Sequence, residues 1–210
     1  MQDVNIAIFA SGSGTNAQNI IEYILNRKYL DDIRNWETTL NPKVSLVLSN
    51  KKDAFVLQRA ANLNVQSLVF SPSQLREPGE VVQKALEKNN INLVILAGFL
   101  LKMPDHLVEQ YDRRIINVHP SLLPKYGGKG MYGDKVHTTV IEAGDNESGI
   151  TIHLVDHEYD NGTHLFQAKC PVIKEDTAQT LATRIHQLEK DHFPRVICEY
   201  IIKLRKESYL

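Results

Sequence analysis

The chain has few cysteines, almost no net charge and no long apolar segment in its 210 residues. Its two cysteines, Cys170 and Cys198, lie far apart and form no Cys-x-x-Cys or Cys/His spacing, so neither a disulfide framework nor a metal site is indicated. A formal net charge of −1 gives no general attraction for nucleic acid or for an anionic membrane. The apolar runs are too short to span a bilayer, and Asp3 stands where a signal peptide needs a basic region. We therefore expect a reduced, cytoplasmic protein without nucleic-acid or membrane partners.

The remaining composition is that of an ordinary globular domain, with 42% hydrophobic and 23% charged residues. We expect one well-packed domain across residues 1–210. Short apolar runs predict strands over residues 4–10, 44–48, 67–70, 92–97 and 114–119. Helical spacing predicts helices over residues 16–25, 54–62, 80–88 and 105–111. This alternation predicts an α/β fold with a mainly parallel sheet that helices cover on both faces.

The pattern changes after residue 125. Residues 125–135 contain four glycines and no apolar periodicity, which predicts a mobile loop. Residues 149–155 and 164–172 are predicted to be strands, joined as an antiparallel hairpin through the turn signal of Asp160, Asn161 and Gly162. Two closing helices are expected over residues 177–192 and 194–205, and a turn is expected at Asn41 and Pro42.

A glycine-rich segment, residues 11–17, lies between the first predicted strand and the first helix. Thr15 or Asn16 is expected to cap that helix, whose free N–H groups and positive end favour an anion. The segment also fits the Gly-x-Gly-x-x-Ala pattern of dinucleotide sites. The second strand, however, is followed by Ser-Asn-Lys-Lys instead of an acidic residue for a ribose, although the lysines suit a 2′-phosphate. A phosphate site, a weakened dinucleotide site and a tight turn without ligand all stay open.

Asn117 and His119 mark a candidate reactive site. They are two residues apart on a predicted strand, so their side chains project to the same side. Pro120 cannot donate to a sheet ladder, so the strand should end there, and in an open α/β sheet ligands bind at that carboxyl end. An amide donor beside an imidazole is suited to stabilising an oxyanion and moving a proton.

Asp160 could join this site only through the fold. An aspartate before Asn-Gly is more often a turn residue. Beside His119, its carboxylate would hold the imidazole protonated and oriented, or position a water. His153 lies on a predicted strand among apolar neighbours and is expected to be a satisfied core histidine, and His137 carries no distinguishing signal.

Taken together, these motifs resemble those of the phosphoribosylglycinamide formyltransferases, folate-dependent enzymes of purine synthesis. The similarity covers nearly the whole chain and includes an Asn-x-His-Pro-Ser-Leu-Leu-Pro motif. It is carried by residues 11–16, 93–99, 117–126, 149–153, 167–169, Asp160 and Glu189.

The resemblance implies a direct formyl transfer without an acyl-enzyme. The glycyl amine of glycinamide ribonucleotide would attack the formyl carbon of the cosubstrate 10-formyltetrahydrofolate. Protonated His119 and the Asn117 amide would stabilise the oxyanion, and loss of one such donor typically costs about 3 kcal/mol. Asp160 would support the charge on His119 and help to pass the amine proton toward the folate through water. Residues 127–133 are a candidate lid that keeps water out.

The resemblance also implies where the two substrates bind, and no metal is expected. The residues expected at the ribonucleotide are Gly14, Thr15, Asn16, His186 and Glu189. The residues expected at the folate are Arg76, Leu100, Leu101, Lys102, Met103, Asn117, Asp156 and Asp160. The implied fold is a single Rossmann-like formyltransferase domain, monomeric or homodimeric, with a nucleotide-binding half over residues 1–118 and a folate-binding, closing half over residues 119–210. Leu101, where many relatives have arginine, and Asn161, where they have glycine, depart from the family pattern.

Three other functions fit parts of the sequence less well. Methionyl-tRNA formyltransferase carries an additional basic domain, and nothing basic beyond one helix follows residue 192 here. Formyltetrahydrofolate hydrolase uses the same three residues with water as nucleophile and has a regulatory domain before its first strand, whereas this sequence starts at that strand. A non-catalytic dinucleotide-binding module is disfavoured by the missing acidic residue after the second strand.

Overall fold

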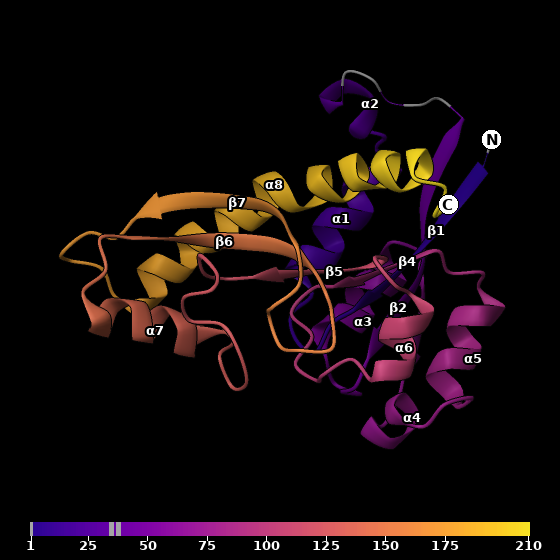
Figure 1. Ribbon diagram of the computed structural model, residues 1–210, viewed down its shortest axis with the longest axis horizontal. Helices are drawn as coiled ribbons and strands as arrows, with labels where there is room; N and C mark the ends of the chain where they lie inside the picture. The colour runs from indigo at the N-terminus through magenta and orange to yellow at the C-terminus, as the bar shows by residue number, and fades with distance from the viewer. Residues whose placement is uncertain (1, 34–35, 37–38) are drawn as a thin grey trace.

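The computed structural model describes residues 2–33, 36 and 39–210 (Figure 1). Its strands form one sheet in the order β3-β2-β1-β4-β5-β6-β7. The strands are β1 (Gln2–Phe9), β2 (Leu40–Ser49), β3 (Gln66–Val69), β4 (Leu93–Leu96), β5 (Ile115–His119), β6 (Glu147–Leu154) and β7 (His164–Pro171). β1 to β5 are parallel, and β6 and β7 add antiparallel to the β5 edge. The predicted α/β class is therefore confirmed.

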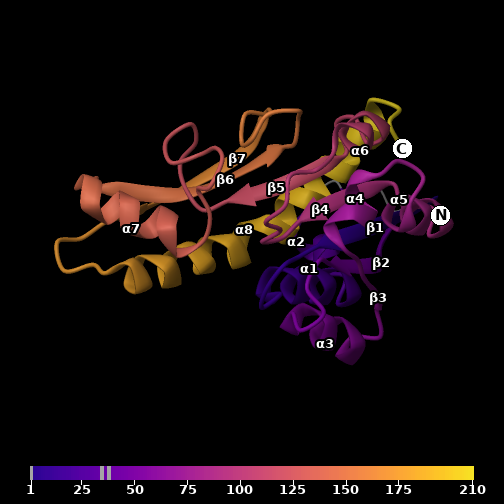
Figure 2. The same ribbon diagram turned by 90° about the horizontal axis from the view of Figure 1, so that it is seen from below.

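Helices cover both faces of the parallel part of the sheet (Figure 2). They are α1 (Thr15–Leu25), α2 (Tyr29–Asp32), α3 (Phe55–Asn62), α4 (Pro72–Arg76), α5 (Val81–Lys88), α6 (Asp105–Gln110), α7 (Asp134–Ala143) and α8 (Ala178–Lys206). Ile6 and Ile8 of β1 pack into a core with α1, α3 and α8, whereas Ala7 and Phe9 pack on the other face with α4, α5 and α6. Continuous hydrophobicity in β1 is thus explained by a strand buried on both sides.

The closing segment is one helix, so the prediction of two helices separated before Pro194 was wrong. α8 runs from Ala178 to Lys206 with Pro194 inside it. Proline has no N–H for the carbonyl four residues earlier, which is that of Lys190. That carbonyl accepts a hydrogen bond from Asn19 Nδ2 of α1 at 2.9 Å instead. Packing between α1 and α8 therefore satisfies the group that the proline leaves free.

The segment predicted as a loop over residues 125–135 gives way to a helix that the sequence pattern did not predict. α7 begins at Asp134, and the β-branched residues within it have weak helix propensity. Val136 and Val140 are buried, and α7 packs against α8, so tertiary contacts compensate for that propensity. Gly144, in the left-handed conformation, ends the helix.

The turn expected at Asn41 and Pro42 is also wrong, because both residues lie inside β2. Pro42 is in register with Val4 of β1, while β3 pairs with Leu46 to Ser49. At Pro42, within the described ranges, β2 therefore pairs with β1 and has no partner strand on its other side. A missing N–H is tolerated at such a position.

The antiparallel pairing of β6 and β7 is confirmed, and Asp160, Asn161 and Gly162 lie in the connection between the two strands. His153 is in register with His164, and Leu154 N donates to Thr163 O at 2.9 Å, so residues 155–162 form the connection. Cys170 and Cys198 are buried free thiols, as expected. Among the described residues, no helix is both long and apolar enough to cross a membrane.

Candidate active site

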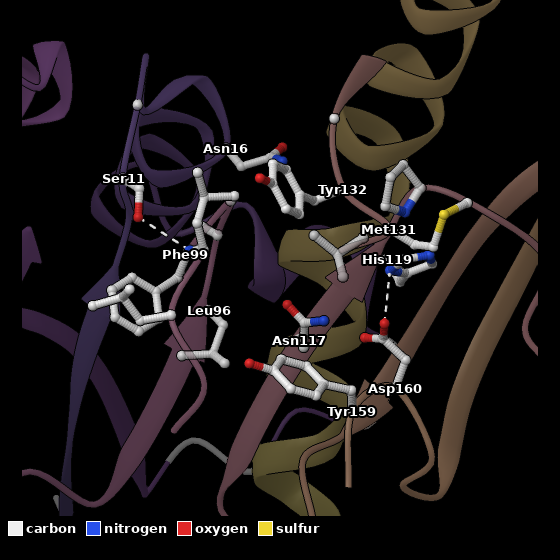
Figure 3. Close-up of a pocket in the computed structure, with 18 of the residues that line it drawn as sticks. Ser11, Asn16, Leu96, Phe99, Asn117, His119, Met131, Tyr132, Tyr159 and Asp160 are labelled. Carbon is white, nitrogen blue, oxygen red and sulfur yellow. Dashed lines mark hydrogen bonds and ion pairs between the residues drawn. The ribbon is translucent and has the colours of Figure 1, made fainter. Parts of the chain in front are cut away.

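A cavity of about 650 Å³ lies at the carboxyl ends of β1, β4 and β5 (Figure 3). The chain crosses from β1 to β2 on one side and returns to β4 on the other, which makes this the switch point where α/β sheets bind ligands. Ser11 ties the surrounding loops together. Its hydroxyl donates to Asn50 Oδ1 at 2.7 Å and accepts from Leu100 N at 3.1 Å.

The loop after β1 places the start of α1 in this cavity. Gly14, not Thr15 or Asn16, is the N-cap residue, which corrects the predicted cap. Its φ of 76° is left-handed, and a Cβ would lie 2.5 Å from the Val56 side chain, so glycine is required. A glycine cap offers no side chain to the first helical N–H groups, which leaves them suited to an anion.

Asn16 is instead held by α8. Its Nδ2 donates to Glu189 Oε2 at 2.8 Å. Glu189 is only 7% exposed, and burial raises the pKa of its carboxyl group. His186, one turn earlier on α8, lines the same end of the cavity. The fold therefore joins the glycine loop to two residues more than 160 positions away in the sequence.

His119 and Asp160 meet, as the functional interpretation of Asp160 required. His119 Nδ1 lies 3.4 Å from Asp160 Oδ2 (Figure 3). His119 Nε2 lies 2.8 Å from the carbonyl oxygen of Tyr126. A carbonyl can only accept, so Nε2 carries the hydrogen and Nδ1 faces the carboxylate. The antiparallel addition of β6 and β7 brings the 155–162 connection back over the end of β5.

The surroundings shift the pKa values of both groups. Burial lowers the pKa of His119 below 6.5, although the Asp160 carboxylate and the Tyr126 carbonyl act in the opposite direction. Burial alone would raise the pKa of Asp160, but His153, His119 and the Gly128 N–H lower it below 3.8. At neutral pH this arrangement thus pairs a neutral imidazole with an ionised carboxylate.

His153 links Asn117 to Asp160, a role that the sequence did not suggest. Its Nδ1 donates to Leu154 O at 2.8 Å, so Nε2 accepts from Asn117 Nδ2 at 3.1 Å. The same Nε2 lies 3.6 Å from Asp160 Oδ1. His153 is buried and satisfied, as expected, yet its register opposite Asn117 makes it part of the site. Nothing in the sequence pattern gave that register.

Most residues that the resemblance assigned to the substrates line this one cavity. They are Gly14, Thr15, Asn16, Leu100, Leu101, Lys102, Met103, Asn117, His119, Asp156, Asp160, His186 and Glu189. Arg76 is not among the described residues that line the cavity, and it is exposed at the end of α4. Ser11 of the glycine loop, Lys51 after the second strand, Tyr132 of the candidate lid and Tyr159 of the 155–162 connection also line the cavity. His137, which carried no distinguishing signal in the sequence, lines it as well. No group of His, Cys, Asp and Glu side chains in the described parts is arranged to hold a metal.

Comparison with known proteins identifies the family of this chain. The family model described as formyl transferase matches residues 4–197. The chain therefore belongs to the formyl transferase family.

Individual relatives define the branch. The chain is 39% identical to a chloroplastic phosphoribosylglycinamide formyltransferase of Arabidopsis thaliana, over 97% of this chain and 68% of that protein. It is 35% identical to the Haemophilus influenzae phosphoribosylglycinamide formyltransferase, over 91% of this chain and 84% of that protein. The crystal structure of phosphoribosylglycinamide formyltransferase from Bacillus halodurans superposes with a TM-score of 0.81 at 30% identity, covering 94% of this chain and 95% of that one.

Within the family, the chain is thus a member of the phosphoribosylglycinamide formyltransferases, enzymes of purine biosynthesis that use a formyl-folate donor. The chain spans 64% of a second plant relative and 13% of an insect trifunctional relative, so it corresponds to one part of those longer proteins.

Proposed function

We propose that this chain transfers the formyl group of 10-formyltetrahydrofolate to the glycyl amine of glycinamide ribonucleotide. The observation that carries the proposal is the meeting of Asn117, His119 and Asp160 in the cavity that also holds the start of α1. One end of this cavity can hold an anion, and the other presents groups that handle charge and protons. Direct transfer between two bound substrates requires the anion-binding end and the reactive groups to lie in the same cavity.

The ribonucleotide would occupy the end formed by α1 and α8. The phosphate would accept hydrogen bonds from the N–H groups after Gly14, where the helix also presents its positive end. Glu189 and His186 would lie at the ribose side. Burial raises the pKa of the Glu189 carboxyl group, whose Oε2 accepts a hydrogen bond from Asn16 Nδ2 at this end.

The folate would occupy the end lined by residues 100–103 and by the 155–162 connection. Leu100 and Tyr159 are each more than 40% exposed and supply apolar surface for a flat ring system. Asp156 and the backbone of the connection supply polar groups. Leu101 lines this end without the charge that arginine would bring. The division into a nucleotide-binding half over residues 1–118 and a folate-binding half over residues 119–210 is part of this proposal, in which each half also contributes residues to the other substrate.

Asn117 and His119 would stabilise the negative charge that develops on the formyl oxygen. Asn117 Nδ2 donates one hydrogen bond to His153 Nε2 and has a second N–H free to donate to the substrate. His119 would become protonated at Nδ1, where Asp160 would stabilise the imidazolium from 3.4 Å. Asp160, ionised in the free protein, would also position the water that carries the amine proton. Residues 128–133 line the cavity and would act as the lid that excludes bulk water.

The test is to mix the purified protein with 10-formyltetrahydrofolate, with and without glycinamide ribonucleotide, and to follow deformylation by absorbance. We expect deformylation that requires the ribonucleotide and falls by about 10²-fold or more in His119→Ala and Asp160→Asn. Deformylation without the ribonucleotide would mean that water is the acceptor, and the proposal would then be replaced by a hydrolase. No reaction in either mixture would refute transfer altogether.

A further inference from the structure

The segment after β5, residues 121–128, connects the catalytic imidazole to the rest of the fold, and we call it the strap. Its first half is fixed by hydrogen bonds to β6. Thr151 Oγ1 donates to Ser121 O at 2.7 Å and accepts from Leu123 N at 3.0 Å. Ser121 Oγ donates to Lys125 O at 2.6 Å, which closes the strap on itself.

The second half of the strap contacts both reacting side chains through its backbone. The Tyr126 carbonyl accepts from His119 Nε2 at 2.8 Å, and the Gly128 N–H donates to Asp160 Oδ2 at 2.9 Å. Gly127 between them leaves no room for a Cβ, which would lie 2.6 Å from a Leu123 methyl group. The orientation of His119 relative to Asp160 therefore depends on where the strap backbone lies.

Tyr126 holds an unfavourable backbone conformation. Its φ of 57° is left-handed, which a residue with a Cβ adopts only when its surroundings fix it. Its ring packs against the core, and its hydroxyl donates to Asp145 Oδ2 at 3.0 Å. Asp145 follows the end of α7, so the pair ties the strap to the α7–β6 connection.

Lys125 also contacts Asp145, at 3.1 Å, but this ion pair differs from the tyrosine contact. The Lys125 side chain is 66% exposed, whereas that of Asp145 is 23% exposed. Exposed ion pairs contribute little to structure because solvent screens them. The tyrosine hydroxyl is therefore the contact through which Asp145 holds the strap.

We propose that Tyr126 and Asp145 are positioning residues, which keep the Tyr126 carbonyl on His119 Nε2 and so direct His119 Nδ1 toward Asp160. The inference deepens the proposed function and rests on it for its kinetic part. The carbonyl selects the Nε2–H tautomer of His119. Without it, the imidazole could turn or change tautomer, and its reactive nitrogen would no longer face the carboxylate and the substrate.

The experiment compares Tyr126→Phe and Asp145→Ala with two matched variants. Lys125→Gln removes the exposed ion pair alone, and Asp145→Asn retains an oxygen that can accept from the tyrosine hydroxyl. For Tyr126→Phe and Asp145→Ala we expect kcat to fall about tenfold while the KM values of both substrates change less than about twofold, since the misplaced group acts in the reaction and not in binding. Lys125→Gln should keep the original kcat, and Asp145→Asn should recover most of it.

A second readout does not depend on turnover. The ¹⁵N signals of the His119 ring, assigned by their loss in His119→Asn, should report the Nε2–H tautomer in the unaltered protein and a mixture in Tyr126→Phe. Unchanged ring signals in Tyr126→Phe would overturn the proposal, even with a lower kcat, and so would an equal loss of kcat in Lys125→Gln. If the unaltered protein shows no ribonucleotide-dependent transfer, the proposed function fails, and the ring signals still decide whether the strap orients His119.

Discussion

His119 combines two demands that oppose each other. An imidazole in a water-excluding site loses proton affinity, and a neighbouring carboxylate restores part of it. In this protein burial is the larger effect, so the pKa of His119 lies below 6.5 in the free state. The protonated form that the proposed transfer would use is therefore costly until negative charge develops beside it. A site of this kind stabilises the transition state more than the resting state.

The lowered pKa predicts how stability depends on pH. Below pH 6.5 the unfolded chain binds a proton on His119 that the folded chain resists, so the contribution of His119 is complete above 6.5 and is lost as pH falls toward its folded pKa. Urea unfolding between about pH 5 and 7 should show a free energy of unfolding that rises with pH. His119→Asn should show a shallower rise. An equal slope in both proteins would mean that His119 titrates as it does in the unfolded chain.

Gly14 offers a second prediction at the scale of one residue. Gly14→Ala should lower the free energy of unfolding by about 1–3 kcal/mol, since it forces a left-handed φ on alanine and a Cβ against Val56. Gly12→Ala is the matched control, because a Cβ there meets no atom within 4 Å and should change stability by less than about 0.5 kcal/mol. Equal effects in the two variants, measured by urea unfolding without ligand, would contradict the steric explanation.

At the scale of elements, α8 depends on a contact that no sequence pattern reveals. We predict that Asn19→Ala lowers the free energy of unfolding by about 1 kcal/mol, since the Lys190 carbonyl loses its donor. In a Pro194→Ala background the new backbone N–H can donate to the same carbonyl, so the effect of Asn19→Ala should nearly vanish. A double-mutant cycle measures this coupling, and additive effects would mean that Asn19 acts through another contact.

The contrast between local signals and distant contacts explains why some predictions of helices and strands were confirmed and others were wrong. β1, β4 and β5 are buried on both faces, so their apolar runs identified them, and Pro120 marked where β5 ends. Proline at residue 194 and the β-branched residues of α7 are local signals against a helix. Contacts with distant segments override them, and a single sequence does not display such contacts.

The residues of the candidate site also fall into those that the sequence could predict and those that depend on the tertiary fold. Asn117 and His119 could be identified because both lie on one short strand at its carboxyl end. The contact between His119 and Asp160, and the register that sets His153 opposite Asn117, depend on the antiparallel return of β6. The resemblance indicated Asp160. It included Tyr126 in its motif without giving that residue a role, and nothing in the sequence indicated Asp145. In the proposal these two residues act through a backbone carbonyl and through a contact between two loops. Neither kind of interaction produces a characteristic residue spacing in the sequence.

For the whole molecule, the arrangement of the cavity determines how ligands should affect unfolding. Its walls come from the loops after β1, β4 and β5 and also from α7, α8 and the 155–162 connection. α8 runs along the length of the molecule, and α7 lies at the end away from the parallel strands (Figures 1 and 2). A substrate held between these parts stabilises them together. Glycinamide ribonucleotide at 100 times its dissociation constant should therefore add about 2.7 kcal/mol to the free energy of unfolding.

This prediction also separates a formyltransferase from a dinucleotide-binding protein, because both would use the glycine loop after β1. Calorimetry should show one unfolding transition that moves upward as a unit with the ribonucleotide, because α8 contacts both α1 and α7. NADP at the same concentration should leave the transition in place. A comparable shift with NADP would indicate that the glycine loop after β1 binds a dinucleotide. Two transitions, of which only one responds to the ribonucleotide, would mean that α8 does not couple the two halves of the chain.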